Sequence, residues 1–210
     1  IPRSPQGRPV LMQAGASPRG KEFAARWAEM IFCSAHAKED ALKYRNSVAA
    51  LLDRFDRPPG DCKVLPSFGV VLGETDAIAR EKADYLNSLL DKDVVLAWKS
   101  NTLGVDLTDM KTEEEVIAAA GNAGIQGSRE RVAQQARAEG ISFYEALRRP
   151  HGVIVGTPKS VADRMEDWFT SGACDGFILW ATIFPGMYEE FARLVVPELQ
   201  RRGLFRTAYP

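Results

Sequence analysis

The sequence predicts an α/β fold with a parallel sheet, equivalent to about half of an eight-unit β/α barrel. Short apolar runs alternate with longer amphipathic stretches along most of the chain, and this alternation is typical of parallel strands joined by helical crossovers. Four apolar runs lead into helical stretches, near Leu11, Ile31, Val70 and Ile178. Four such units are half of an eight-unit barrel. The alternative is a complete, small open sheet of the flavodoxin type.

The composition is that of an ordinary soluble domain. The chain has 210 residues, of which 45% are hydrophobic and 26% charged, with a net charge of −1. This near-neutral balance gives no electrostatic footprint for nucleic acid. No apolar run approaches the roughly 18 residues of a membrane helix, and no signal peptide is visible. We therefore expect a cytoplasmic protein that binds neither nucleic acid nor membrane.

The cysteines and histidines offer no metal site. Cys33, Cys62 and Cys174 are odd in number, widely spaced and set among apolar residues, so we expect reduced thiols in the core. The chain has only two histidines, and no histidine–cysteine cluster has the spacing of metal ligands.

The first predicted unit is a strand, a small-residue turn and a helix. Val10–Met12 is a short apolar run, long enough for one buried strand. Ser17 and Pro18 are a favourable N-cap and a favourable first helical residue. The helix is expected over Gly20–Ala28, with Phe23, Ala24 and Trp27 on one face at helical spacing.

The turn between them is a candidate anion site. Gln13, Gly15 and Ala16 lie between the strand and Ser17, without a bulky apolar side chain among them. Backbone N–H groups at the positive end of a helix, beside a hydroxyl, form a ready cradle for phosphate. The alternative is that Ser17 only caps its helix.

The following elements continue the alternation. We expect strands over Met30–Cys33 and Lys63–Leu72, and helices over Lys38–Phe55 and Glu74–Leu90. Pro66 and Gly69 inside the long strand predict a bulge or a bend.

The alternation of predicted strands and helices is interrupted over about residues 91–150. This stretch contains no clear strand, and helices are expected over Glu113–Ala120, Arg129–Ala138 and Ser142–Arg149. Glu113–Glu115 reads as a solvated helix start favoured by the helix dipole. The stretch has too little apolar material for a core of its own. We therefore expect one partial domain over residues 1–210 with an insertion at about 91–150, in the place where insertions commonly cover active sites.

The alternation of predicted strands and helices resumes from about Val153. Val153–Val155 precedes a helix over Lys159–Ser171, a strand over Gly176–Trp180 and a helix over Met187–Arg202, in which Pro197 predicts a kink. The expected buried positions of the two helices are Val161, Met165, Trp168, Phe169, Phe191, Leu194, Val195 and Leu199.

Other candidate site residues are weaker. Thr157 repeats the cap-plus-proline pattern, which favours a plain N-cap over an anion role. His36 follows the second strand and either lines a site or is an exposed loop histidine, whereas His151 is expected to be structural. Trp180 and Phe184 follow the last strand and either wall an apolar substrate pocket or belong to the core.

Two features indicate a piece of a longer protein. The chain starts at Ile1 in a Pro- and Gly-rich lead. A half barrel would also leave two sheet edges and an apolar inner face exposed.

Three segments together resemble one known group of proteins. Arg8–Ser17 (R-P-V-L-M-Q-A-G-A-S), Val155–Phe169 with Asp175–Leu179, and Val195–Thr207 are similar to the two-component flavin-dependent monooxygenases of the bacterial luciferase-like superfamily, related to nitrilotriacetate, dibenzothiophene-sulfone and long-chain alkane monooxygenases. The resemblance covers nearly the whole chain and implies the C-terminal half of an interrupted TIM barrel. It also implies a missing N-terminal half, which supplies further flavin contacts in that group, so the catalytic residues are unknown.

The resemblance assigns a cofactor and partners. It implies that Ser17 binds the phosphate of FMN, with backbone groups near Gly15 and Ala16 completing the cradle and Gln13 either facing the flavin ring or bonding to a neighbouring strand. A separate NADH:FMN reductase would supply FMNH₂, and the enzyme would use O₂ to oxygenate a small organic substrate, as part of a homo-oligomer. We expect these 210 residues alone to be inactive.

Two other functions stay open. One is a deazaflavin-dependent oxidoreductase of the same superfamily. The other is a non-catalytic half barrel that only self-associates through its open edges.

Overall fold

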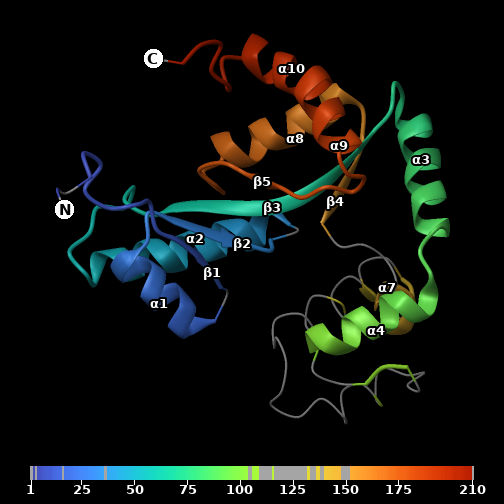
Figure 1. Cartoon of the computed structure of the whole chain (residues 1–210), viewed down its shortest axis with the longest axis horizontal. Coiled ribbons are helices and arrows are strands. Elements are labelled where there is room, and N and C mark those ends of the chain that lie inside the picture. Colours follow the sequence, from blue (N-terminus) through green and yellow to red (C-terminus); the bar gives the residue numbers. More distant parts are fainter. Residues whose placement is uncertain are drawn as a thin grey trace. The chain divides into compact units, whose positions relative to one another are not determined.

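The computed structural model describes residues 2, 4–15, 17–35, 37–103, 106–108, 115, 132, 136–137, 140–147 and 152–209. The chain divides into two compact units. One comprises Ile1–Lys82 with Gly152–Pro210, and the other comprises Ala83–His151. The first contains a parallel sheet and its helices (Figure 1). The prediction of a single partial domain with an insertion at about 91–150 stays a prediction.

The elements of the first unit follow the alternation expected from the sequence. They are β1 (Met12–Ala14), α1 (Pro18–Trp27), β2 (Met30–Cys33), α2 (Lys38–Asp53), β3 (Lys63–Leu72), the start of α3 (Asp76–Ser88), β4 (Val153–Gly156), α8 (Pro158–Thr170), β5 (Ile178–Leu179), α9 (Gly186–Glu190), the π-helical turn η1 (Phe191–Val195) and α10 (Val196–Arg201). The expected strands over Met30–Cys33 and Lys63–Leu72 have these bounds, whereas β1 begins later than expected, at Met12.

The sheet is parallel at every pairing and is centred on β3. β2 pairs with its first part, up to Pro66, and β4 pairs with its last part, from Gly69. Lys63 and Gly69 donate their N–H groups toward Glu29 and Gly152, so β2 and β4 follow one another along the same edge of β3. The carbonyls of Val64 and Phe68 face the opposite edge, where they accept from the residues flanking β5.

The order of neighbouring strands is therefore β1, β2, β3 and β5, with β4 extending the sheet beyond β2. These four strands are the four β/α units expected from the sequence. The α/β prediction with a parallel sheet is confirmed.

Of the two alternatives predicted from Pro66 and Gly69, a bulge or a bend, the bulge is wrong, because the pairings of β3 keep a continuous register. The strand runs unbroken over ten residues and instead changes its partner between these two positions. Gly69 serves a close approach, because a Cβ there would lie 2.7 Å from Cγ2 of Thr182 and 3.0 Å from the ring of Trp180.

Helices cover one face of the sheet. Along β3, alternate side chains point to that face, and Val64, Phe68 and Val70 are at most 5% exposed. They belong to two apolar clusters, one around α1 and α2 and the other around α8 and η1. Strand residues alternate between faces, so the intervening positions lie on the opposite face.

That opposite face, here called the open face, carries Met12 and Ala14 of β1, Met30 and Phe32 of β2, and Leu65 of β3, which stand in register. Met12 is 48% exposed, and Met30, Phe32 and Leu65 are half-buried. An apolar face that its own domain leaves partly exposed matches the expected interior of a half barrel.

Some helical side chains expected in the core are exposed. Of the three residues expected on one face of α1, Ala24 is buried, whereas Phe23 and Trp27 are 55% and 51% exposed, because the helix packs through Ala24 and Ala25. Phe169 and Leu194 are 48% and 40% exposed, so their predicted burial is wrong.

The backbone of the last helical segment explains why Leu194 is exposed and not buried as predicted. The structure has the π-helical turn η1 just before Pro197, and the kink predicted at Pro197 stays a prediction. A π turn takes more residues than the 3.6 of an α-helix. The buried positions consequently recur every four residues, as Met187, Phe191, Val195 and Leu199, and Leu194 turns outward.

The second unit contains the rest of α3, α4 (Lys92–Leu103) and α7 (Phe143–Leu147). α4 was not expected, whereas α7 falls within the helix expected over Ser142–Arg149. The helices expected over Glu113–Ala120 and Arg129–Ala138 lie almost entirely outside the described residues.

The three cysteines are free and buried, as expected. Burial raises the pKa of Cys33 to about 12 and those of Cys62 and Cys174 to about 11. Among the described residues, no helix is long and apolar enough to cross a membrane. The same part of the chain holds no cluster of His, Cys, Asp and Glu suited to a metal ion.

Candidate functional site

The turn from β1 into α1 has the geometry expected from its residues. Ser17 is the N-cap of α1, and its Oγ accepts a hydrogen bond from the N–H of Gly20 at 3.1 Å. Pro18 follows in the first turn, where its missing N–H costs nothing. Ser17 is thus a helix cap, and its side chain is also exposed to solvent.

The electrostatics of this helix end favour an anion. The first turn of α1 contains no acidic residue. The N–H of Gly20 is taken by Ser17, whereas the N–H of Arg19 precedes the first possible intrahelical acceptor. The Ser17 hydroxyl accepts from Gly20 and keeps its own hydrogen to donate. One hydroxyl and one amide at the positive end of a helix can bind a small anion together.

Helix α2 holds the turn from the other side. The hydroxyl of Tyr44 donates to the carbonyl of Gly15 at 2.5 Å. This contact joins residues 29 positions apart in the sequence, and the sequence analysis missed it because no local pattern reports it.

Gln13 has a local role in the structure. Its amide donates to the carbonyl of Ala14 at 3.0 Å. Gln13 also stands in register with Ile31, a buried residue on the helix-covered face, so it lies on the face opposite the open one. Ala16 lies outside the described residues.

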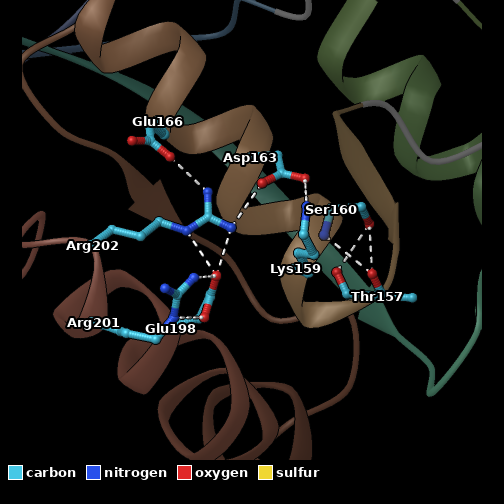
Figure 2. A network of polar contacts seen from close by, with 8 residues as sticks. All are labelled: Thr157, Lys159, Ser160, Asp163, Glu166, Glu198, Arg201 and Arg202. Carbon is cyan, nitrogen blue, oxygen red and sulfur yellow. Dashed lines mark hydrogen bonds and ion pairs between the residues drawn. The ribbon is translucent and has the colours of Figure 1, made fainter.

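The second cap-plus-proline turn, between β4 and α8, is satisfied internally. Thr157 caps α8 by accepting from the N–H of Ser160 at 3.1 Å, and the Ser160 hydroxyl donates to the Thr157 carbonyl at 3.0 Å (Figure 2). The polar groups of Thr157 and Ser160 thus satisfy one another through hydrogen bonds, which matches the plain N-cap expected for Thr157.

Of the aromatic candidates, Trp180 reaches the open face. Its ring packs where a Cβ on Gly69 would project, and Gly69 shares that face with Leu65. Phe184 is 80% exposed and makes an edge contact with Tyr188, so it is not a core residue. His36 and His151 lie outside the described residues.

An arginine that the sequence analysis did not single out connects α8 and α10. Arg202 pairs with Asp163 and Glu166 of α8 and with Glu198 of α10, each at 2.7 Å (Figure 2). The four-residue spacing of Glu198 and Arg202 is the only local signal for it. The charge of Arg202 is thus paired with carboxylates of two helices, and the turn at Ser17 remains the candidate anion site.

Comparisons with known proteins agree with this architecture. Dibenzothiophene-sulfone monooxygenase of Rhodococcus erythropolis is 36% identical over all of this chain and 48% of its own length. One of the pristinamycin IIA synthase polypeptides of Streptomyces pristinaespiralis is 40% identical over all of this chain and 50% of its own length. The chain therefore spans about half the length of these curated relatives.

Solved structures also match the chain over its whole length or nearly so. The crystal structure of DmoA from Hyphomicrobium sulfonivorans superposes on the whole chain with a TM-score of 0.85 at 28% identity, over 45% of its own length. A riboflavin lyase solved with modified FMN and riboflavin has a TM-score of 0.78 at 26% identity, over 99% of this chain and 46% of that protein.

The family model for luciferase-like monooxygenases matches residues 1–175. With the half-barrel architecture and the curated relatives, this match confirms the resemblance drawn from the sequence motifs. The chain belongs to the luciferase-like monooxygenase family.

Proposed function

We propose that this chain contributes the FMN phosphate site of a monooxygenase that uses FMNH₂ and O₂ to oxygenate a small organic substrate. The observation that carries the proposal is the exposed Ser17 hydroxyl at the N-terminus of α1, in a first turn without acidic residues. Family membership supports the activity, and a solved relative with modified FMN supports the cofactor.

The residues of the turn fit a phosphate. A dianion needs hydrogen-bond donors and a positive potential, which the Ser17 hydroxyl, the Arg19 amide and the helix end offer together. Gly20 leaves room for it, since a Cβ at this position would lie 3.1 Å from the Ser17 Oγ and crowd the hydroxyl.

The remaining task of this chain is to orient the cofactor and exclude water. Bound reduced FMN would supply the electrons that activate O₂. Ser17 and α1 would hold the phosphate end. The open face, with Phe32, Leu65 and the ring of Trp180, would give the rest of the site apolar walls. Such walls would exclude water, and water exclusion strengthens the electrostatic interactions within a site.

The proposal includes partners and setting. A relative whose name marks it as one part of a multi-polypeptide synthase supports a second component, for which we propose an NADH:FMN reductase. The same proposal includes completion of the barrel by a further half, a homo-oligomeric state and a cytoplasmic location.

We also propose that these 210 residues alone do not catalyse substrate turnover, since relatives are about twice as long. Substrate oxygenation by this polypeptide with FMNH₂ and no added chain would overturn that.

A Ser17→Ala substitution tests the phosphate site. In the complete polypeptide that the gene encodes, we expect the Kd for FMNH₂ to rise at least about tenfold, because a hydrogen bond to a charged group contributes roughly 1.5–3 kcal/mol. The measurement is anaerobic titration followed by flavin fluorescence.

Thr157→Ala is the matched control. It removes the same kind of cap from α8, so it carries a similar stability cost of about 1 kcal/mol and should leave the Kd for FMNH₂ unchanged. Equal affinities in Ser17→Ala and the unmodified protein would exclude Ser17 from the site. Tighter binding of a deazaflavin than of FMNH₂ would favour the deazaflavin alternative.

A further inference from the structure

The side chain of Tyr44 connects the candidate phosphate turn to the body of the unit. Its hydroxyl donates to the Gly15 carbonyl at 2.5 Å. Its ring is held as well, because the Lys21 ammonium lies 5.3 Å from the ring centroid and donates to the Ser47 hydroxyl at 3.1 Å. Ser47 in turn donates to the Tyr44 carbonyl at 2.7 Å. Lys21 of α1 thus contacts the ring, and Ser47 of α2 connects Lys21 to the backbone of Tyr44.

We propose that Tyr44 is a positioning residue for the flavin phosphate: its hydrogen bond to Gly15 fixes the turn in the conformation in which Ser17 and the start of α1 bind the anion. The inference rests on the proposed function, since it assigns Tyr44 a role in the same site. Tyr44 does not touch the ligand and acts through the backbone.

The backbone geometry explains how a hydroxyl can act in this way. A peptide unit is planar, and the backbone has only two soft dihedral angles per residue. A hydrogen bond to the Gly15 carbonyl therefore restricts the backbone dihedral angles of Gly15, the residue directly after β1. Glycine is the residue whose backbone would otherwise be freest, so this position gains most from an external hydrogen bond.

The donor state of Tyr44 is secure at neutral pH. Burial raises the pKa of the Tyr44 hydroxyl above its ordinary value, and the neighbouring Cys33 and Cys62 raise it further. The hydroxyl stays protonated and can donate to Gly15 throughout the physiological range.

The test compares two ligands that differ only in the phosphate. Reduced FMN and reduced riboflavin are titrated anaerobically into the complete polypeptide and its Tyr44→Phe variant, and the ratio of the two Kd values is taken. Phenylalanine keeps the ring and removes one hydroxyl. We expect the preference for FMN over riboflavin to fall roughly three- to tenfold, as for one lost hydrogen bond.

This ratio separates positioning from folding. A smaller folded fraction raises both apparent Kd values by the same factor and cancels in the ratio. The matched control is Tyr188→Phe, which removes a tyrosine hydroxyl that donates to the Leu179 carbonyl at 3.2 Å, away from the turn. It should leave the preference for FMN unchanged.

The outcomes are distinguishable from those of the proposed function. A reduced FMN preference in both Ser17→Ala and Tyr44→Phe supports the inference. A reduced preference in Ser17→Ala alone, or an equal loss of affinity for both ligands in Tyr44→Phe, overturns the role of Tyr44 and leaves the phosphate site standing. An unchanged preference in Ser17→Ala overturns the phosphate site itself and the role of Tyr44 with it.

Discussion

At the scale of single residues, several polar side chains satisfy backbone groups that the strands and helices leave unpaired. Asp175 is the clearest example. One carboxylate oxygen accepts from the N–H of Val64 at 2.9 Å, and the other pairs with Arg45 at 3.0 Å. Arg45 also donates to the carbonyl of Gly172 at 3.1 Å. The pair thereby ties α2 and the approach to β5 to the start of β3.

The first prediction concerns this pair. Asp175→Asn removes the charge that Arg45 faces and one strong acceptor, so we expect the free energy of unfolding to fall by about 1–3 kcal/mol. Urea denaturation at pH 7 measures it. Glu22→Gln is the control, because Glu22 pairs with Arg54 at 3.7 Å on an exposed surface, where such pairs contribute roughly 0–1 kcal/mol. A similar, small change in both variants would contradict the role of Asp175.

At the scale of elements, the contact between β3 and β5 depends on a missing side chain. Gly69 faces Trp180 and Thr182, which follow β5 in the chain, and Thr182 donates to the carbonyl of Val70 at 2.7 Å. The segment after β5 therefore packs directly on the backbone of β3.

The second prediction tests this approach. Gly69→Ala places a methyl group 2.7 Å from the Thr182 side chain, and overpacking of this kind costs about 1–3 kcal/mol of stability. Thermal unfolding followed by circular dichroism measures the loss. Gly186→Ala serves as the control, since a Cβ there meets no atom within 4 Å and should leave Tm nearly unchanged. An unaltered Tm in Gly69→Ala would show that the segment moves aside freely.

The helices α8 and α10 are joined by the Arg202 cluster shown in Figure 2. The Arg202 side chain is only 10% exposed, and that of Glu198 is 19% exposed. Hydrogen bonds from Arg201 and Arg202 lower the pKa of Glu198 from 4.5 to about 2, and those from Lys159 and Arg202 lower the pKa of Asp163. A carboxylate with a lowered pKa stabilises the folded state above its unfolded pKa and loses this contribution as the pH falls through the folded value.

The third prediction follows from that sign. Glu198→Gln should be less stable than the unmodified protein at pH 7, and the difference should shrink as the pH falls from 4.5 toward 2. Urea denaturation at pH 7, 4 and 3 provides the measurement. Glu81→Gln, on the exposed surface of α3, should show no such trend. A difference that stays constant with pH would assign the loss to packing instead of charge.

At the scale of the whole molecule, the sheet has one face covered by helices, whereas the open face is exposed along β1 and buried toward the end of β3, at Gly69 and Val71. The open face is apolar, and β1 and the residues before it at the sheet edge, Val10, Leu11 and Met12, are 42–55% exposed. Unpaired edges and apolar faces of this kind promote association between chains. A half-length relative of longer enzymes is expected to have such a surface, because the remainder of a barrel would cover it.

The fourth prediction is that this 210-residue polypeptide, prepared alone, self-associates as its concentration rises. Light scattering with size-exclusion chromatography measures the mass. Met12→Lys places a charge on the open face and should reduce association, whereas Leu194→Lys, on an exposed helical position away from β1, should not. A monomer at all concentrations would show that the open face is satisfied within the chain.

Local patterns were enough to predict most of the elements and both helix caps. The strands Met30–Cys33 and Lys63–Leu72 and the caps Ser17 and Thr157 were predictable, since apolar periodicity and capping residues act within a few positions of the chain. The exposure of Phe23 was not predictable, because an apolar stripe does not reveal which of its members the neighbouring element covers.

The β/α alternation, the family and the turn at Ser17 could be read from the order of residues alone. Three features required the folded chain: β4 follows β2 along one edge of β3, Tyr44 donates to the Gly15 carbonyl, and Asp175 accepts from the N–H of Val64. The difference lies in how far apart the partners are along the chain. Periodicity and capping arise among near neighbours, whereas these contacts join segments 29 to 111 residues apart, and such partners meet only when the sheet and its helices have packed.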